Sequence, residues 1–274
     1  MIIDGHLHIA GEPEPILARM DALGIARTVL VGIGVRDLRA VTVRDSVVFR
    51  VPFLLRTVGV PKSRAMVRSL HARGLLLPQP DNDRVAAALR AYRDRFRGFV
   101  FVNPAHPDML AEARRRLDSG FQGIKLALLQ YPAALDGPEV SALCELARAR
   151  HVPVFFHPGL TAATADASGM VGRFPDVRFI VAHAGAQHFE QAVSVAESHR
   201  NVWLDTSSFF VTPAKLRRLI RRPGPSRLVF ASDVPVMALD PADALAKITA
   251  LPLSAPERDA ILGGNLTAIL EGRA

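Results

Sequence analysis

Side chains that bind metal ions stand at the ends of apolar segments in this sequence. The chain opens with IIDGHLH, in which His6 and His8 lie two positions apart at the end of an apolar run. Side chains alternate between the two faces of a β-strand, so both imidazoles are expected on one side of it. Imidazole nitrogens are common zinc ligands, and this spacing lets one ion take both. The N-terminal segment therefore predicts a metal site.

Four further residues of this kind follow apolar, strand-like runs. They are Lys125 in GIKLAL, His157 in VPVFFHPG, His183 in RFIVAHAG and Asp233 in RLVFASDVP. Asp233 is predicted to be a ligand that also accepts the proton of metal-bound water, with capping of the next segment as the alternative. For His157 and His183 the alternative is packing against the helix that follows. Together these strand ends predict one metal site assembled from distant parts of the chain.

Lys125 has two readings that the sequence leaves open. The chain uses arginine for most of its cations, yet it places this lysine inside an apolar strand. Burial penalises an ammonium, so the amine is expected to lose its proton or to find a partner. As a neutral amine it could form a carbamate that bridges two metals; as an ammonium it could pair with Asp233 or an anionic substrate. Asp4 is expected on the same side as His6 and His8, where it would orient a ligating ring.

The elements that must position these residues alternate regularly along the chain. Nearly continuous apolar runs such as TVLVGI and FVFV are typical of parallel strands covered on both faces. Eight strands, each followed by a helix, predict an α/β fold, a single (β/α)8 TIM barrel over residues 1–274 with a C-terminal helix at 255–271. A doubly wound sheet is the alternative, but HLHIAGEPEP lacks its glycine-rich phosphate turn. The predicted strands are 2–8, 27–33, 98–103, 122–128, 152–157, 177–183, 201–205 and 227–231, and the helices are 14–24, 84–96, 106–119, 138–150, 163–173, 186–199, 212–222 and 240–250.

One connection, residues 36–83 after the second strand, is too long for a simple loop. It is apolar, with FRVPFLLR near its middle and a helical pattern at 62–74. We expect an insertion over the barrel mouth that forms a lid, part of the substrate pocket or an oligomer contact. Arg50 and Arg56 within it favour an anionic substrate. The predicted site lies at the C-terminal ends of the strands, where barrel enzymes place their active sites.

Composition excludes several classes of protein. The chain is 49% hydrophobic, enough for a sizeable core, but no apolar run reaches the ~20 residues of a membrane span. Because a candidate ligand stands as early as His6, no signal peptide is expected. A single cysteine, Cys144, is predicted to be an inert packed thiol and favours a cytoplasmic protein. The net charge is +8, but the arginines are scattered and aromatics are only 6%, so nucleic-acid binding is not expected.

Other polar residues are assigned structural roles. Thr206, Ser207 and Ser208 are predicted either to supply hydroxyls to the barrel mouth or to cap the next helix. Surface or capping roles are predicted for the remaining histidines, which are His71, His106, His151, His188 and His199.

Taken in order and spacing, these motifs resemble the amidohydrolase superfamily, in particular its branch of metal-dependent hydrolases related to aminocarboxymuconate-semialdehyde decarboxylase. The segments that carry the resemblance are IIDGHLH, GFQGIKL, VPVFFHPG, PDVRFIVAHAG, NVWLDTS, RLVFASDVP and GGNLTAIL. The resemblance implies a TIM barrel in which His6, His8, His157 and Asp233 hold one ion, while His183 polarises substrate or positions water. In binuclear members a carbamylated lysine bridges two ions and both later histidines bind the second. The decarboxylases' substrate-binding arginine has no counterpart that we can align.

The sequence therefore predicts a zinc-dependent hydrolase. Metal-activated water would attack an amide, lactone or related carbonyl of a small-molecule substrate, with Asp233, His183 and Lys125 as catalytic residues. The alternative on the same site is a metal-dependent non-oxidative decarboxylase of a small unsaturated carboxylic acid. A non-enzymatic barrel that binds metal or a partner through segment 47–60 is a third possibility. A homodimer is expected.

Overall fold

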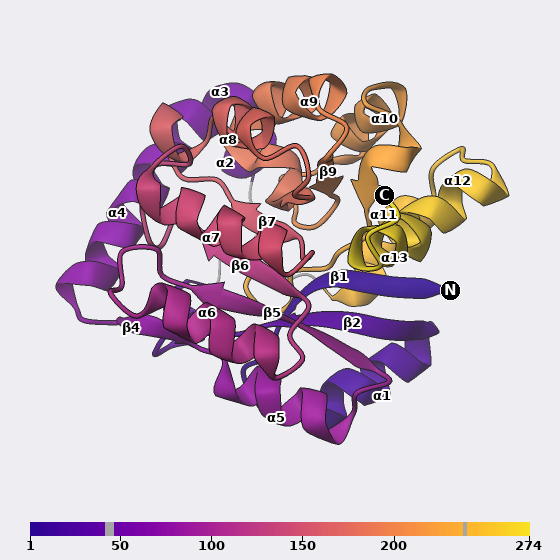
Figure 1. Cartoon of the computed structure of the whole chain (residues 1–274). Coiled ribbons are helices and arrows are strands. Elements are labelled where there is room, and N and C mark those ends of the chain that lie inside the picture. The colour runs from indigo at the N-terminus through magenta and orange to yellow at the C-terminus, as the bar shows by residue number, and fades with distance from the viewer. Residues whose placement is uncertain (42–46, 238–239) are drawn as a thin grey trace.

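Eight parallel strands form a nearly closed barrel, as the sequence predicts (Figure 1). The computed structural model describes residues 1–41, 47–237 and 240–274, without the side chains of 49, 50, 52 and 56. Arg50 and Arg56 therefore lie outside the described side chains. The strands, in barrel order, are β1 (Ile2–His8), β2 (Ile25–Val31), β5 (Phe96–Val102), β6 (Gly123–Ala127), β7 (Val154–His157), β8 (Phe179–Val181), β9 (Val202–Asp205) and β10 (Leu228–Val229).

The barrel closes where the first strand meets the segment after the last one. The Gly5 amide donates to the Phe230 carbonyl (2.9 Å), and the His8 amide donates to the Val234 carbonyl (2.8 Å). The Asp233 amide in turn donates to the His6 carbonyl (2.7 Å). The approach is close enough that a Cβ at Gly5 would lie 3.0 Å from the Phe230 oxygen. This seam brings the predicted ligands His6 and His8 on β1 side by side with the segment that contains Asp233.

Two apolar layers hold the barrel together. Inside it, Ile3, Phe99, Phe155 and Trp203 pack with the C-terminal helix residue Leu266. A larger layer joins the outer faces of the strands to the surrounding helices, and it contains Cys144, which is fully buried. Burial raises the pKa of the Cys144 thiol to about 12, in keeping with the inert thiol that the sequence predicts. Strands buried on both faces explain the continuous apolar runs of the sequence.

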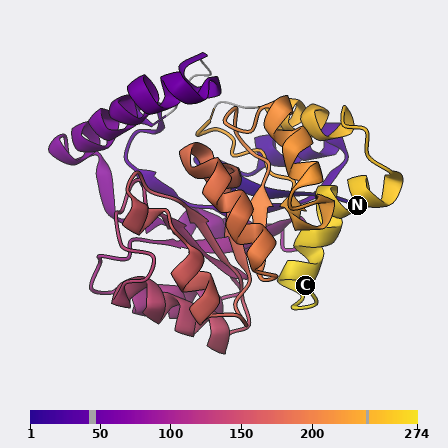
Figure 2. The same ribbon diagram turned by 90° about the horizontal axis from the view of Figure 1, so that it is seen from above.

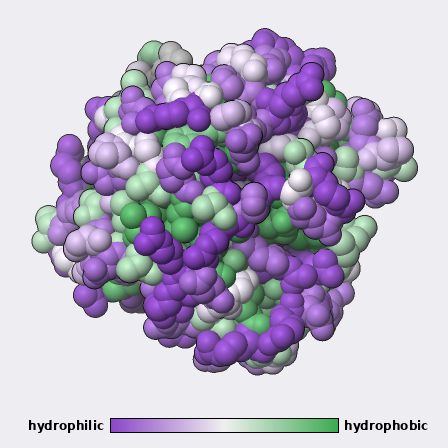
Figure 3. All heavy atoms as spheres, in the orientation of Figure 1, coloured by the Kyte–Doolittle hydropathy of each residue, from purple (hydrophilic) through white to green (hydrophobic). Residues whose placement is uncertain are grey.

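The connecting helices lie around the outside of the strands (Figure 1). They present mainly hydrophilic residues on the face that Figure 3 shows, with small apolar areas between them. No helix of the described residues is long and apolar enough to cross a membrane. The helices are α1 (Glu14–Leu23), α5 (Asp83–Ala91), α6 (Met109–Asp118), α7 (Pro138–Ala149), α8 (Ser168–Arg173), α9 (Phe189–Ser198), α10 (Pro213–Arg221), α11 (Pro241–Thr249), α12 (Ala255–Asp259) and α13 (Asn265–Leu270).

The described part of the segment after β2 is an insertion with helices and a small sheet of its own rather than a loop. Its two arms, β3 (Ile33–Val35) and β4 (Leu76–Asp81), pair as a separate antiparallel sheet. Between them lie α2 (Val47–Arg50), α3 (Pro52–Leu54), a π-helical stretch (Leu55–Gly59) and α4 (Val60–Ala72), the helix predicted near 62–74. Figure 2 shows this purple segment running along one edge of the molecule. Leu55 packs against Phe209 and Met237, so the insertion reaches the loops beyond the strand ends.

Candidate metal centre

Three predicted ligands converge at the barrel seam. Nε2 of His6 and Nε2 of His8 lie 3.2 Å apart, and Oδ1 of Asp233 is 3.4 Å and 3.5 Å from them. These ligand atoms all lie within 4.8 Å of one another, and the three side chains are largely buried. The β1 pair supplies two imidazoles to one side, as the sequence predicts, and the seam adds the carboxylate.

The hydrogen bonds of these groups leave a set of electron pairs that a cation would satisfy. Nδ1 of His8 donates to the Gly32 carbonyl (2.7 Å), and Nδ1 of His6 faces a carboxylate oxygen of Asp205 (3.3 Å). Each neutral ring then carries its proton on Nδ1, so both Nε2 atoms are acceptors. Asp233 Oδ1 is buried and has no hydrogen-bond partner among the described residues. The two Nε2 atoms and Oδ1 of Asp233 are thus acceptors that face one another, and such an arrangement suits a divalent metal ion.

Burial shifts the protonation of this centre in the direction that ligation requires. Desolvation, followed by the charge of Lys125, lowers the pKa of His6 well below its ordinary value and that of His8 to about 3. Both rings are therefore neutral at physiological pH, as metal ligands must be. Desolvation raises the pKa of Asp233 well above its ordinary value, although Lys125 opposes the shift. A cation at the centre would reverse that cost by stabilising the carboxylate.

Lys125 points into the centre from β6. Its Nζ lies 3.3 Å from Nε2 of His6 and 3.7 Å from the centre of the Phe155 ring. Desolvation lowers the pKa of this amine to about 8, while the carboxylates of Asp233 and Asp205 oppose the shift. The buried lysine that the sequence singles out therefore does belong to the centre. Its neighbourhood is compatible with both the amine and the carbamate readings.

His157 and His183 reach the same cavity from β7 and the turn after β8. Nε2 of His183 is 3.5 Å from Asp233 Oδ2, and the His157 and His183 rings are 4.8 Å apart. His157 donates from Nδ1 to the Pro158 carbonyl (2.8 Å), which leaves its Nε2 as an acceptor. His157 lies outside the compact group of three ligand atoms. All six predicted side chains thus line one cavity, with three of them in tight convergence.

Asp205, at the end of β9, is the site residue that the sequence reasoning missed. It accepts hydrogen bonds from the His183 amide (2.8 Å), the Ser207 amide (2.9 Å) and the Ser207 hydroxyl (2.5 Å), besides facing His6. Burial opposes its ionisation, but the hydrogen bond from His6, the interaction with the His183 ring and the hydrogen bond from the Ser207 hydroxyl hold its pKa below the ordinary value. The signal was present, because NVWLDTS places Asp205 at a strand end like the other candidates.

Ser207 resolves one of the sequence's alternatives. Its hydroxyl donates to Asp205, so it accepts from Nδ1 of His183 (2.8 Å) and fixes that ring. The following helix α10 is capped instead by Thr212, whose hydroxyl accepts from the Lys215 amide. The triplet therefore serves the barrel mouth through Ser207. A chain of contacts runs from Asp205 through Ser207 to His183 and on to Asp233.

Asp4 does not orient a ligating ring, contrary to the expectation from strand alternation. The register of β1 against β2 shifts between Asp4 and Leu7, and Asp4 lines a different cavity from the histidines. Its carboxylate accepts from the His6 amide (3.1 Å) and from the amide and hydroxyl of Ser232 (2.9 Å and 2.5 Å). Asp4 thus links the backbone of His6 to that of Ser232, next to Asp233, while Asp205 is the carboxylate that faces the His6 ring.

Two of the site residues have unusual backbones. Asp233 (φ 60°) and His183 (φ 53°) are in the left-handed region, as are Ala184 and Ala186 beside the latter. This conformation costs a non-glycine residue roughly 1–2 kcal/mol. After β8 the non-helical backbone of residues 183–186 is followed by α9 only at Phe189, later than the predicted start at 186. The surrounding fold therefore holds both side chains over the barrel mouth at some energetic cost.

The cavity above the centre is small and mostly apolar. It holds about 70 Å³, and Val41 and Met66 of the insertion contribute to its wall, which places that segment in the pocket as the sequence allows. Gln130 also lines it, and its buried Oε1 has no partner among the described residues. The other histidines are exposed or half-buried and do not line this cavity. The lining that the structure describes also includes Phe101, Ala127, Leu129, Val236 and Met237.

Comparison with known families places this centre in context. Residues 71–270 match the family model described as amidohydrolase, so the chain belongs to the amidohydrolase family. Divalent metal centres are typical of that family, and it consists of enzymes. A curated relative, the gamma-resorcylate decarboxylase of Rhodococcus jostii (strain RHA1), is 27% identical over 214 residues. The match covers 56% of this chain and 64% of that relative, so the chain spans less than two thirds of its length.

Solved structures with the same fold are similar over nearly their whole length. An uncharacterised TIM-barrel protein from Bordetella bronchiseptica has a TM-score of 0.73 at 17% identity, covering 99% of both chains. A probable 2-pyrone-4,6-dicarboxylic acid hydrolase from Acinetobacter baumannii has a TM-score of 0.70 at 14% identity, covering 98% of this chain and 99% of that one. A dihydroxybenzoic acid decarboxylase from Polaromonas, with bound manganese, has a TM-score of 0.63 at 18% identity, covering 98% and 96%. These likenesses support the fold.

Proposed function

We propose that the chain, as one catalytic domain over residues 1–274, is a metal-dependent hydrolase of an amide, lactone or related carbonyl in a small molecule. The observation that carries this proposal is the position of Asp233. Its Oδ1 faces the acceptor nitrogens of His6 and His8, and its Oδ2 faces Nε2 of His183. A carboxylate in that position can take a proton from an attacking water and deliver it to the leaving group.

The metal that we propose is zinc, held by His6, His8, His157 and Asp233. Three imidazoles and one carboxylate are a typical zinc donor set, and the Polaromonas neighbour makes manganese the alternative. A divalent ion in such a centre polarises a carbonyl and lowers the pKa of water. If a second ion binds, His183 and Lys125 would complete its ligands.

The protein's own groups supply orientation and proton transfer. Ser207 keeps the proton of His183 on Nδ1, so Nε2 can accept a hydrogen bond from the protonated Asp233. Asp205 keeps the proton of His6 on Nδ1 and its Nε2 free. The apolar wall formed by Phe101, Met237 and their neighbours restricts the entry of further water.

Lys125 enters this proposal as either a neutral amine or a carbamate. A dication nearby disfavours an ammonium at this position, since like charges repel in a buried site. Intact mass spectrometry under non-denaturing conditions, with metal analysis of the same sample, distinguishes the two. A mass increase of one carbon dioxide, absent from Lys125→Met, with two metals per chain identifies the carbamate. The unmodified mass with one metal identifies the amine.

A second candidate function is non-oxidative decarboxylation of a small unsaturated acid on the same centre. The 27% identical decarboxylase from Rhodococcus jostii favours it, as does the apolar wall, which destabilises a free carboxylate. In that reaction the carbon–carbon bond breaks to release carbon dioxide, and Asp233 would donate its proton to the carbon left behind. The substrate in either case is a small molecule, proposed to be anionic.

Asp233→Asn tests the shared step. The variant is expected to fold and to retain metal, with activity reduced by about 10²-fold or more, because the amide cannot accept the proton. Purified protein is assayed against lactones, amides and unsaturated acids, with pH change and carbon dioxide release as separate readouts. His71→Gln, an exposed position, is the matched control. Full activity of Asp233→Asn would exclude the assigned proton carrier, and carbon dioxide release would select the decarboxylase. A homodimer and a cytoplasmic location stay predictions.

A further inference from the structure

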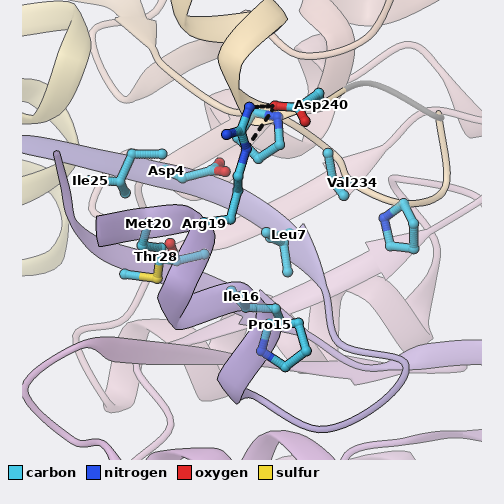
Figure 4. A pocket seen from close by; sticks show the side chains of 12 residues that line it. Asp4, Leu7, Pro15, Ile16, Arg19, Met20, Ile25, Thr28, Val234 and Asp240 are labelled. Carbon is cyan, nitrogen blue, oxygen red and sulfur yellow. Dashed lines mark hydrogen bonds and ion pairs between the residues drawn. The ribbon is translucent and has the colours of Figure 1, made fainter. Parts of the chain in front are cut away.

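A second cavity lies on the other side of β1 from the metal centre. We call it the α1 cavity; it holds about 450 Å³ between α1, the first two strands and the segment that leads into α11. Figure 4 shows its side chains pointing toward a common space, with Asp4 and Leu7 on β1 and Ile16 and Met20 on α1. Cavities of this volume are typical of small-molecule sites. Among the residues that the structure describes, it shares none of its lining with the metal cavity.

The walls of the α1 cavity are apolar and its charges lie at one edge. Leu7, Ile16, Met20, Ile25 and Val234 form most of the described wall, together with three prolines. At the edge, Arg19 donates to Asp240 from two nitrogens (2.8 Å and 3.2 Å), and Figure 4 shows this ion pair as dashed lines. Both partners are about half exposed, so water screens the pair and it contributes little energy. A ligand could enter beside it without breaking a buried contact.

Two buried polar groups in this cavity have unused hydrogen-bonding capacity. The Thr28 side chain is fully buried and lines the cavity, yet its hydroxyl has no partner among the described residues. Buried hydroxyls are nearly always paired, so this one points to a missing partner. Asp4, also buried, accepts three hydrogen bonds, while a carboxylate has about four acceptor sites. One site is therefore left for a donor from outside the chain.

We propose that the α1 cavity binds a small, uncharged, apolar molecule with one hydroxyl group, such as a phenol or an alcohol. The hydroxyl would donate to Asp4 and accept from Thr28, which satisfies both groups at once. The apolar body would pack on Ile16 and Met20, where a thioether favours an aromatic ring. Carboxylates are disfavoured, because Asp4 and Asp240 together outweigh Arg19, the one cation among the described lining residues.

Asp4 lies between this cavity and the backbone beside the metal centre. Asp4 accepts from the backbone amides of His6 and Ser232, the latter next to Asp233 in the chain. A hydroxyl bound to Asp4 would use its remaining acceptor site and leave these two hydrogen bonds in place. The binding itself does not depend on the proposed reaction.

Methyl NMR of methionine-labelled protein tests the proposal directly. Met20 lines the α1 cavity, whereas Met66 and Met237 line the metal cavity, so the two sites have separate reporters. Phenol is titrated into the full chain, and signals are assigned by substituting each methionine with leucine. A saturable shift of the Met20 signal, with Met66 and Met237 unmoved, is expected. Shifts confined to Met66 and Met237, or no saturable shift at Met20, would overturn the proposal.

Matched ligands and a matched variant test the hydroxyl contact. Toluene has nearly the shape of phenol without the hydroxyl, and benzoate has the excluded charge. Toluene is expected to bind the Met20 site about three- to tenfold more weakly than phenol, the factor for one net hydrogen bond. Benzoate is also expected to bind more weakly than phenol, because Asp4 and Asp240 repel its carboxylate. Thr28→Val keeps the side chain's shape and should reduce the difference in affinity between phenol and toluene. Equal binding of toluene and phenol to the original chain would refute the assigned chemistry.

Discussion

Replacing Asp205 by Asn probes the residue that links the two halves of the site. The carboxylate accepts from the His183 amide and from both groups of Ser207 through Oδ1, and it faces Nδ1 of His6 through Oδ2 (3.3 Å). Asparagine can keep the first set of contacts with its oxygen. Its amide nitrogen then faces the protonated Nδ1 of His6, donor against donor. The ring can relieve this only by moving its proton to Nε2.

The expected magnitude follows from that change of tautomer. A proton on Nε2 removes the electron pair that His6 presents beside His8 and Asp233. Loss of a group that orients a metal ligand typically weakens metal binding 10–100-fold, or about 1.4–2.8 kcal/mol. Folding should be less affected, since three of the four contacts remain. We therefore expect a folded Asp205→Asn protein with zinc affinity reduced by one to two orders of magnitude.

Zinc affinity is measured by competition with a chromophoric chelator at pH 7, with circular dichroism to confirm folding. Asp4→Asn is the matched control, because Asp4 is a buried carboxylate that contacts the His6 backbone but not its ring. It should bind zinc nearly as tightly as the original protein. Unchanged affinity in Asp205→Asn, or an equal loss in Asp4→Asn, would refute the role assigned to Asp205.

Three further predictions concern stability and activity. Burial raises the pKa of Asp4 from 3.8 to about 6, so the native state favours its protonated form; this stabilisation is present below pH 3.8 and is lost as the pH rises through 6. Asp4→Asn should therefore stabilise the metal-free protein at pH 7 by up to about 3 kcal/mol and lose that advantage near pH 4, as urea unfolding at the two pH values would show; a constant difference would contradict it. Gly32→Ala should lower the melting temperature, because its Cβ would lie 2.0 Å from the Asp81 carbonyl oxygen, and should weaken zinc binding, because the Gly32 carbonyl orients the His8 imidazole. Calorimetry and chelator competition measure the two effects, and an unchanged variant would count against the close approach. Ser207→Ala should leave Nδ1 of His183 unpaired, at a cost of about 1–3 kcal/mol, and should reduce kcat while the zinc affinity stays unchanged. Steady-state kinetics and metal titration measure kcat and zinc affinity separately, and a parallel loss of both would argue against a role through His183.

The barrel and most of its site could be predicted from residue patterns alone. Continuous apolar runs identify buried parallel strands, and parallel strands in a barrel end at one mouth. Residues that follow such runs must therefore share that mouth. This reasoning correctly brings Lys125, His157, His183 and Asp233 into the cavity that contains His6 and His8. It applies equally to Asp205, which also ends a strand and which the sequence reasoning did not include.

The alternation of side chains along a strand could not predict departures from regular strand geometry. The register shift within β1 turns Asp4 away from the histidines, and left-handed backbones at His183 and Asp233 set the directions of their side chains. The order of residues also says nothing of which ring nitrogen meets which acceptor, as in the pairing of His183 with Ser207.

The amino-acid sequence by itself determined the alternating elements and the identity of the groups at the strand ends, because periodic burial is a local property of the chain. Only the tertiary structure decided which of those groups converge and how they are protonated. Hydrogen bonds between residues some 200 positions apart, such as His6 to Asp205, depend on how the barrel closes. The insertion's share of the cavity wall, through Val41 and Met66, was decided in the same way.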